Sequence, residues 1–399
     1  MTTFREIRSG LVPELPPLEP AAREHSERVS ELIRREITAA HGRISFDRFM
    51  ELALYAPGLG YYTAGSRKLG AGGDFVTAPE VSSLFGRCLA RQCSQVLDQL
   101  SEACILEFGA GTGTLAADLL MELAALGRLP DNYLILELSP DLRQRQQAIL
   151  AERVPELLPR VQWLDRLPQR FQGLMLGNEL LDAMPVQRFR IGRGGFQEEF
   201  VTWRDGFVPE YADVATPGLT EALMRLREQR LAVAEGYASE VNLRVGPWVK
   251  AVSDSLVAGA VFLIDYGYPR SEYYHPQRSM GTLMCHYRHR AHPDPFRFVG
   301  LQDITAHVDF SAVAEAARAA GLAVQGYTTQ AFFLLGCGLD RLLADSDPAD
   351  SEVHLRLVQE VRRLTLPTEM GESFKVIALT RGIEGLLVGF SLRDLRDRL

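Results

Sequence analysis

Two carboxylates follow an apolar run in the middle of the chain, within LMLGNELLDAMPVQRF (Leu174–Phe189). The run predicts a buried strand that breaks at Gly177 and is followed by Asn178, Glu179 and Asp182. Carboxylates at the end of a buried strand need a partner, because an unpaired charge away from water is costly. This stretch therefore predicts a site that either binds a cation or transfers a proton.

A glycine loop precedes this site in the sequence. The apolar run ACILEF leads into GAGTGTLAADLLMELAALG, which places Gly109, Gly111 and Gly113 in a turn before a helix. Such a loop lets the backbone approach a ligand, and the start of the helix offers unpaired N–H groups. In dinucleotide-binding loops (G-x-G-x-x-G) the third glycine falls where this chain has Thr114, which disfavours NAD. Glu107 beside the loop would repel a pyrophosphate and attract an ammonium group, which favours S-adenosylmethionine.

Acidic residues also end the next two predicted strands. Glu137 ends the second strand, where it can accept hydrogen bonds from both ribose hydroxyls, and Ser139 and Pro140 can begin the following helix. Asp165 ends the third strand and is either a contact for the adenine amino group or a surface acid of the loop. Together with Glu107, these strand-end acids favour an S-adenosylmethionine-dependent methyltransferase, although a glycine turn that binds nothing remains an alternative.

The elements that must hold these residues alternate between strand and helix, which predicts an α/β fold with a parallel sheet covered by helices on both faces. In such a sheet, ligands bind at the carboxyl ends of the strands. Alternating aromatic and polar residues over 188–211 predict inserted hairpins, and two helices are expected near 21–40 and 44–55. The expected strands are Ala103–Phe108, Tyr133–Leu138, Val161–Leu164, Leu174–Leu176, Ala260–Asp265, Leu322–Gln325 and Phe374–Thr380.

Composition limits the partners of the chain. The 399 residues have a formal net charge of −8 with both signs interspersed, which argues against a nucleic-acid groove. No apolar run approaches the ~20 residues that span a bilayer, and MTTFREIRSG has no hydrophobic core of a secretion signal. The five cysteines include no C-x-x-C pair, which fits reduced thiols. We therefore expect a cytoplasmic protein without a nucleic-acid or membrane partner. Whether it forms a homodimer is left open.

Seven motifs occur in the order seen in one known family: GDFVTAPEVSSLFG, EFGAGTGTLAADLL, NELLDAMPVQRF, LIDYG, GTLMCHYRH, DITAHVDF and GESFKVIAL. Over residues 25–382 the chain resembles the MidA-like family, which is similar to class I methyltransferases. The resemblance implies a protein arginine methyltransferase whose mitochondrial relative acts on a core subunit of respiratory complex I. A protein that presents an arginine, such as a complex I subunit, is then the expected partner. Because no mitochondrial transit sequence is evident, a bacterial member is expected.

The resemblance and the strand-end acids together indicate where the cofactor binds, and composition and periodicity indicate how the chain is divided. Ala110 stands between two glycines where family members often have proline. The cofactor-binding residues are expected to be Asp74, Thr77, Pro79, Glu107, Gly109, Ala110, Gly111, Glu137, Asp165 and Asn178. The expected parts are an extended arm (1–20), an N-terminal helical region with a glycine-rich capping loop (21–100), a seven-stranded Rossmann-like class I methyltransferase core (101–385) with insertions at about 188–257 and 268–310 that form a substrate lobe, and a C-terminal tail (386–399).

In this setting, Glu179 and Asp182 are the expected catalytic acids, because a carboxylate that binds two guanidinium N–H groups holds an arginine in place and draws its positive charge. Arginine methyltransferases of the better-known type carry a pair of glutamates after the same strand. The alternative is that Glu179 caps a following helix and Asp182 pairs with Arg188 or Arg190. His307, with nearby Asp309, either relays a proton to solvent or fixes a loop.

Other functions are disfavoured by particular residues. Cys285, His286, His289 and His292 do not have the spacing of a zinc site and lie beside prolines, so no metal is expected. A nucleic-acid methyltransferase would need an aromatic residue to stack the base where Leu180 and Leu181 follow. A catalytically silent assembly chaperone that binds a respiratory complex subunit is the main alternative.

Overall fold

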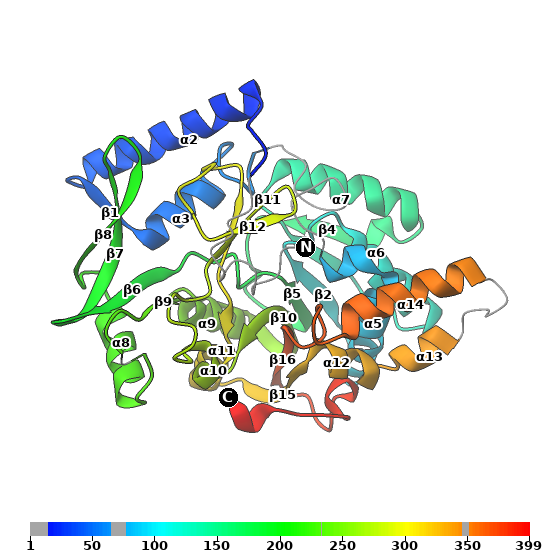
Figure 1. Cartoon of the computed structure of the whole chain (residues 1–399). Coiled ribbons are helices and arrows are strands. Elements are labelled where there is room, and N and C mark those ends of the chain that lie inside the picture. Colours follow the sequence, from blue (N-terminus) through cyan, green and yellow to red (C-terminus); the bar gives the residue numbers. More distant parts are fainter. Residues whose placement is uncertain (1–14, 65–76, 233, 345–350) are drawn as a thin grey trace. The chain divides into compact units, whose positions relative to one another are not determined.

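The computed structural model describes residues 15–64, 77–232, 234–344 and 351–399 (Figure 1). The chain divides into two compact units, each built from three separate segments. The first unit comprises Met1–Phe75, Asp182–Val245 and Arg270–His307, and the second comprises Val76–Leu181, Gly246–Pro269 and Val308–Leu399. Asp74 lies outside the described residues.

The second unit contains an eight-stranded sheet with the order β15-β16-β10-β5-β2-β3-β4, in which β14 also pairs with β10. The strands from β10 to β4 run parallel, whereas β16 is antiparallel to both of its neighbours. The strands are β2 (Cys104–Phe108), β3 (Tyr133–Leu136), β4 (Val161–Leu164), β5 (Phe171–Asn178), β10 (Leu256–Tyr268), β14 (Val308–Asp309), β15 (Ala323–Thr329) and β16 (Phe374–Arg381). This Rossmann-like α/β sheet confirms the predicted fold class. β5 and β10 extend beyond their apolar centres.

Helices of the second unit connect and cover these strands. They are α4 (Ala78–Val81), α5 (Ser83–Leu97), α6 (Thr114–Ala125), α7 (Pro140–Arg153), α9 (Val245–Ser255), α11 (Phe310–Ala319), α12 (Gln330–Gly336), α13 (Leu339–Ala344) and α14 (Ser351–Thr365). Short 3-10 turns occur at Leu158–Arg160, Val388–Phe390 and Arg396–Arg398. As predicted, Ser139 caps α7: its side chain accepts a hydrogen bond from the N–H of Leu142.

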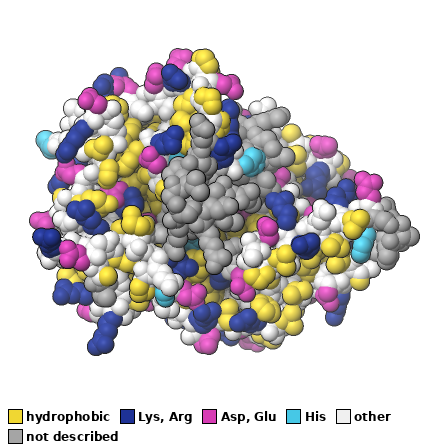
Figure 2. All heavy atoms as spheres, viewed as in Figure 1, with side chains coloured by type: hydrophobic (Ala, Val, Ile, Leu, Met, Phe, Trp, Pro, Cys, Tyr) yellow, Lys and Arg dark blue, Asp and Glu magenta, His cyan; other side chains and the backbone are white. Residues whose placement is uncertain are grey.

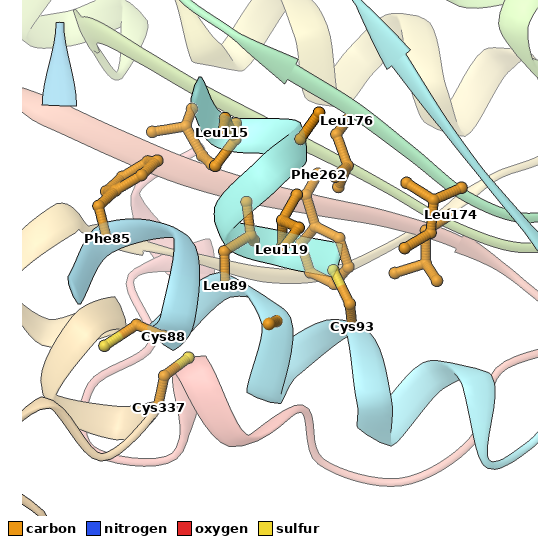
Figure 3. Close-up of a cluster of buried hydrophobic side chains, with 14 of the residues drawn as sticks. Phe85, Cys88, Leu89, Cys93, Leu115, Leu119, Leu174, Leu176, Phe262 and Cys337 are labelled. Carbon is orange, nitrogen blue, oxygen red and sulfur yellow. The ribbon is translucent and has the colours of Figure 1, made fainter. Parts of the chain in front are cut away.

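One face of the sheet packs on helices to form the main core (Figure 3). Alternate residues of β5, Leu174 and Leu176, and Phe262 of β10 point toward α5 and α6. Period-two alternation puts these side chains on one face of the sheet, where helical residues at i, i+3 and i+4 can cover them. Cys88 and Cys337 lie in the same core as free thiols, and burial raises the pKa of both. This core fixes the strands whose carboxyl ends hold the candidate site.

The first unit is built around a five-stranded sheet, of order β1-β7-β6-β9 with β8 beside β7, and a three-stranded sheet of order β12-β11-β13. The antiparallel pairs β6/β7 and β7/β8 confirm the hairpins predicted over 188–211. Phe49 of α3 centres its core and packs edge-on against Phe207 and Phe296. The elements are α2 (Pro20–Ala39), β1 (Arg43–Ser45), α3 (Phe46–Tyr55), β6 (Gln187–Gly192), β7 (Gly195–Trp203), β8 (Phe207–Asp213), α8 (Leu219–Glu228), β9 (Ala238–Val241), α10 (Arg270–Tyr273), β11 (Met284–Tyr287), β12 (Arg290–His292) and β13 (Asp303–Thr305).

The surface carries charges of both signs. Figure 2 shows acidic and basic side chains interspersed over the visible face, in keeping with a modest net charge of −8. No helix among the described residues has the length and apolar character needed to span a membrane.

Candidate active site

The glycine loop follows β2 in a conformation that favours glycine. Gly109, Gly111 and Gly113 have φ angles of +61°, +54° and +93°, which place all three in the left-handed region. A Cβ on Gly113 would lie 3.1 Å from the Cα atom of Gln146 on α7, so this position also needs the small residue. A Cβ on Gly109 would meet no heavy atom within 4 Å in the described part of the chain. Among the described residues, the loop therefore leaves space next to Gly109, whereas it packs closely against α7 at Gly113.

Glu107 lies beneath this loop and is almost fully buried, at 3% exposed. The hydroxyl of Tyr133 donates a hydrogen bond to its Oε2 atom over 2.7 Å. Burial raises the pKa of Glu107 to about 7, against the lowering effect of the Tyr133 bond, and the nearby Glu137 raises it further. A carboxyl with this pKa is poised to ionise when a cation binds beside it.

Glu137 accepts hydrogen bonds on both carboxylate oxygens. Its Oε1 accepts from the backbone N–H of Ser139 at 2.9 Å, and its Oε2 from the Nε2 of Gln146 at 3.2 Å. The same Gln146 nitrogen donates to the carbonyl of Gly111 at 3.1 Å, and Trp163 donates to the Gln146 oxygen at 2.9 Å. Burial raises the pKa of Glu137. Gln146 therefore joins the acid to the glycine loop, a role that its place in the polar run RQRQQ does not signal.

Helix α4 contacts the glycine loop through Glu80. Thr77 is the N-cap residue of α4, and Pro79 lies in its first turn. Glu80 of this helix accepts a 2.5 Å hydrogen bond from the hydroxyl of Thr112 in the loop. The structure thus brings Thr77 and Pro79 close to the loop, through a glutamate that the sequence did not single out.

Asp165 is exposed, with 84% of its side chain accessible to solvent. Its carboxylate pairs with Arg143 at 2.6 Å, and Arg143 also donates to the Glu137 carbonyl at 2.6 Å. Leu138, directly after Glu137, is an exposed apolar residue at 69%. An apolar side chain beside a buried acid offers a surface for a flat ring, which the sequence did not predict.

The turn after β5 holds Glu179 in an unusual backbone conformation. Its φ angle is +50°, in the left-handed region that side chains other than glycine rarely adopt. Asn178 donates a 3.1 Å hydrogen bond to the Glu179 Oε1 atom. Residues 179–186 form turns and bends without a helix, so the alternative in which Glu179 caps a helix does not hold.

Two buried strands anchor this turn. The N–H of Glu179 donates to the carbonyl of Ile264 at 2.9 Å. The next two N–H groups, of Leu180 and Leu181, donate to the Oδ2 atom of Asp265 at 3.1 and 2.9 Å. Asp265 ends an apolar run in the sequence, which marks a strand but gives no sign that its carboxylate holds another segment.

Asp182 and His307 belong to the first unit, whereas Glu179 belongs to the second. Asp182 is buried, and its carbonyl accepts a hydrogen bond from the N–H of Ala306 at 3.0 Å. The backbone N–H of His307 donates to the hydroxyl of Thr282 at 3.1 Å. Asp309 caps α11 by accepting from the N–H of Ala312. The backbone of Asp182 and that of His307 are therefore held by hydrogen bonds within the first unit.

The arginines offered as alternative partners of Asp182 are engaged elsewhere. Arg188 donates to Glu199 at 2.7 Å, and Arg190 donates to Gln197 at 2.9 Å and lies over the ring of Tyr211. These contacts stabilise the β6/β7 hairpin rather than the segment that carries Asp182.

The cysteine and histidines of the β11/β12 hairpin are spread along two paired strands. Cys285 lies opposite His292, and His286 lies opposite Ala291. His289 has a φ angle of +61° in the connecting turn. Burial lowers the pKa of His286 to about 4, helped by His292. Among the described residues, no group of three or more His, Cys, Asp or Glu side chains is arranged to hold a metal ion.

Known proteins match this chain over most of its length. Residues 88–328 match the family described as "Putative S-adenosyl-L-methionine-dependent methyltransferase". The chain belongs to this family. The crystal structure of a "likely methyl transferase" from Burkholderia thailandensis, with S-adenosyl-homocysteine bound, is similar to this chain. The two are 48% identical, with a TM-score of 0.93, and the match covers 97% of this chain and 100% of that one. The resemblance seen in the motifs is confirmed, and S-adenosylmethionine is the cofactor of this methyltransferase.

Curated relatives match this methyltransferase over most of their own length. "Protein arginine methyltransferase NDUFAF7, mitochondrial" of Mus musculus is 30% identical over an alignment of 370 positions that covers 85% of this chain and 81% of the mouse protein. The Homo sapiens protein of the same name is 29% identical over an alignment of 372 positions that covers 85% of this chain and 80% of the human protein. These names favour the enzyme over the silent chaperone. They contradict the expected cytoplasmic location, because the relatives are named as mitochondrial proteins.

Proposed function

We propose that this methyltransferase transfers a methyl group to an arginine side chain of a protein substrate. The observation that carries the proposal is the register of two neighbouring strands. Phe108, at the end of β2, pairs with Gly177 of β5, so the glycine loop and Glu179 leave the same edge of the sheet within two residues of paired positions. The relatives named as protein arginine methyltransferases support the same substrate class.

The residues of the second unit suit the cofactor in kind and position. Glu107 would bind the ammonium group of the methionine part, and Glu137 would accept the ribose hydroxyls while Leu138 packs against the adenine. Gly109, Ala110 and Gly111 would let the backbone approach the cofactor. When bound, the cofactor supplies a methyl group on a positively charged sulfur. The other proposed cofactor-binding residues are Thr77, Pro79, Asp165 and Asn178, together with Asp74, which lies outside the described residues.

The proposed role of Glu179 is to orient the substrate guanidinium. A carboxylate that accepts two N–H groups fixes the planar group and draws its positive charge, which leaves another nitrogen able to attack. The N–C bond then forms as the S–C bond breaks, and the methylated nitrogen loses a proton. Asp182 is proposed as the second acid and His307 as the group that passes the proton toward solvent. By the family resemblance, a complex I subunit is the first substrate to examine.

Glu179→Gln tests this role, because it keeps the shape of the side chain and removes its charge. We expect the affinity for S-adenosyl-homocysteine, measured by calorimetry, to stay within about twofold. Transfer of tritium from labelled S-adenosylmethionine to lysate proteins of cells that lack this protein should fall by at least ~10²-fold. Glu235→Gln, at an exposed ion pair with Arg193, is the control. Near-parental transfer by Glu179→Gln would show that it does not orient the substrate.

Mass spectrometry tests the substrate class separately. Proteins labelled in the same lysate should carry methylarginine, and those sites should lack the modification in the deletion strain and carry it in the parent. Label found on lysine or on nucleic acid would exclude the arginine proposal while leaving the cofactor site intact.

A further inference from the structure

The carboxylate of Asp265 accepts hydrogen bonds from the backbone of the turn that follows β5. It is 1% exposed and lies within β10, three residues before the strand ends at Tyr268. Its Oδ2 accepts the N–H groups of Leu180 and Leu181, and its Oδ1 accepts the N–H of Tyr266 at 2.9 Å. Hydrogen bonds to a charged acceptor are the stronger kind, and this one side chain receives three of them.

These bonds offset strain at the neighbouring residue. A left-handed φ at a residue other than glycine costs on the order of 1–3 kcal/mol, and it persists only where the surroundings fix it. Two consecutive residues of β10 hold the turn at Glu179. The Ile264 carbonyl accepts the N–H of Glu179, and the Asp265 carboxylate accepts the N–H groups of Leu180 and Leu181. Asn178 additionally holds the Glu179 carboxylate. The direction of the Glu179 side chain therefore depends on β10 as well as on β5.

We propose that Asp265 is a positioning residue that holds Glu179 in its left-handed turn for the reaction. The proposal rests on the function proposed for Glu179. Asp265 is buried, so it acts through the turn and does not touch the substrate. A simple structural anchor would have the same contacts, but its loss would affect the enzyme whether or not Glu179 is charged. That difference separates the two roles.

Asp265→Asn changes the chemistry of this anchor and little of its size. Asparagine has one acceptor oxygen and an NH₂ group, so one of the backbone N–H groups now faced by a carboxylate oxygen would face a donor instead. The turn would shift or sample other conformations. A displacement of about 1 Å at an orienting group can lower turnover by ~10²-fold.

The test compares Asp265→Asn in two backgrounds, with tritium transfer to proteins of the deletion-strain lysate as the measurement. In the parent, Asp265→Asn should reduce transfer by about 10–10²-fold. In the Glu179→Gln background, it should reduce the remaining transfer by less than about threefold, because residues that act as one unit are not additive. Affinity for S-adenosyl-homocysteine should stay within about twofold in both, and Asp265→Glu should not restore transfer if the geometry of the turn matters.

A matched control is available in the first unit. Glu198 is likewise 1% exposed, and its carboxylate accepts the N–H groups of Ala215 and Thr216. Glu198→Gln removes a similar buried anchor, and its effect on transfer should be the same with and without Glu179→Gln. If Asp265→Asn fails to fold, Asp265→Ser, which keeps an acceptor oxygen, enters the same comparison.

The outcomes separate the two proposals. If Asp265→Asn costs the same factor in both backgrounds, or leaves transfer unchanged while Glu179→Gln reduces it, Asp265 is only a structural anchor. If Glu179→Gln itself leaves transfer near the parental value, the proposed function of Glu179 fails first. A loss of cofactor affinity in Asp265→Asn would also overturn the positioning role.

Discussion

At the scale of single residues, the candidate site is built from buried carboxyls whose partners come from distant parts of the chain. Glu107 was predicted because it lies beside the glycine loop, and Glu137 because it ends the next apolar run. Gln146 and Asp265 were not predicted, because their contacts with Gly111 and Leu181 join segments 35 and 84 residues apart. Sequence spacing shows which residues end a strand. It does not show which side chain on another element will reach them.

Glu107 should make cofactor binding depend on pH. Its folded-state pKa of about 7 lies above the ordinary 4.5, so between these values the carboxyl is protonated in the folded protein and ionised in the unfolded chain. Its contribution to stability is therefore present below pH 4.5 and is lost as pH rises toward 7, by about 3 kcal/mol. An ammonium group favours the ionised form, so affinity for S-adenosyl-homocysteine should rise with pH up to about 7.

Calorimetry can check this linkage directly. At pH 6, binding should release about one proton, seen as a dependence of the binding enthalpy on the ionisation enthalpy of the buffer. Glu107→Gln should remove most of this release. An unchanged release in Glu107→Gln would place the ammonium group elsewhere.

At the scale of elements, the sequence predicted the strands well and their ends less well. Apolar runs mark the buried centre of β5 and β10, but the polar ends continue the ladder, as in the pairing of Ile264 with Asn178. Short elements such as α4 have too few residues to show a period. The turn at Glu179 was missed because its left-handed φ follows from hydrogen bonds to β10 and not from a glycine.

The glycine loop should no longer bind the cofactor when a larger residue replaces one of its glycines with a left-handed φ. Gly111→Val should abolish binding of S-adenosyl-homocysteine, because a branched side chain is strained at a φ of +54° and occupies space that the cofactor needs. Gly127→Val is the matched control: its φ is +68°, at the other end of α6, and no described heavy atom lies within 4 Å of its Cβ position. Both variants should lose similar thermal stability. Calorimetry should show binding lost only in Gly111→Val, and equal affinities would move the cofactor away from this loop.

At the scale of the whole molecule, residues far apart in sequence are grouped into two units. The predicted division at residues 20, 100 and 385 follows the chain in order and remains a proposal. Contacts instead gather three segments into each unit, with a boundary between Leu181 and Asp182. Composition and periodicity describe residues that are neighbours in the sequence. They therefore cannot show that a strand pair near residue 290 shares a unit with the helix at residue 50. The proposed cofactor-binding residues that the structure describes all lie in the second unit.

This division predicts that damage to the first unit will separate binding from turnover. Phe49 is fully buried in α3, and the last residue of this helix, Tyr55, donates a 2.9 Å hydrogen bond to the carbonyl of Ala183, next to Asp182. Phe49→Leu should cost about 1–1.5 kcal/mol of stability and loosen the helix that holds this segment. Tritium transfer should then fall by about tenfold.

The affinity for S-adenosyl-homocysteine, measured by calorimetry on the same Phe49→Leu protein, should stay within about twofold. Phe390→Leu is the control, because Phe390 is also buried but packs on Phe333 in the second unit. None of the contacts described for Phe390 involves a proposed site residue. It should lower stability to a similar extent and leave transfer near the parental value. If Phe49→Leu lost cofactor affinity in step with transfer, the cofactor site would depend on both units. Retained affinity with reduced transfer would assign binding of the cofactor to the second unit and placement of Asp182 to the first.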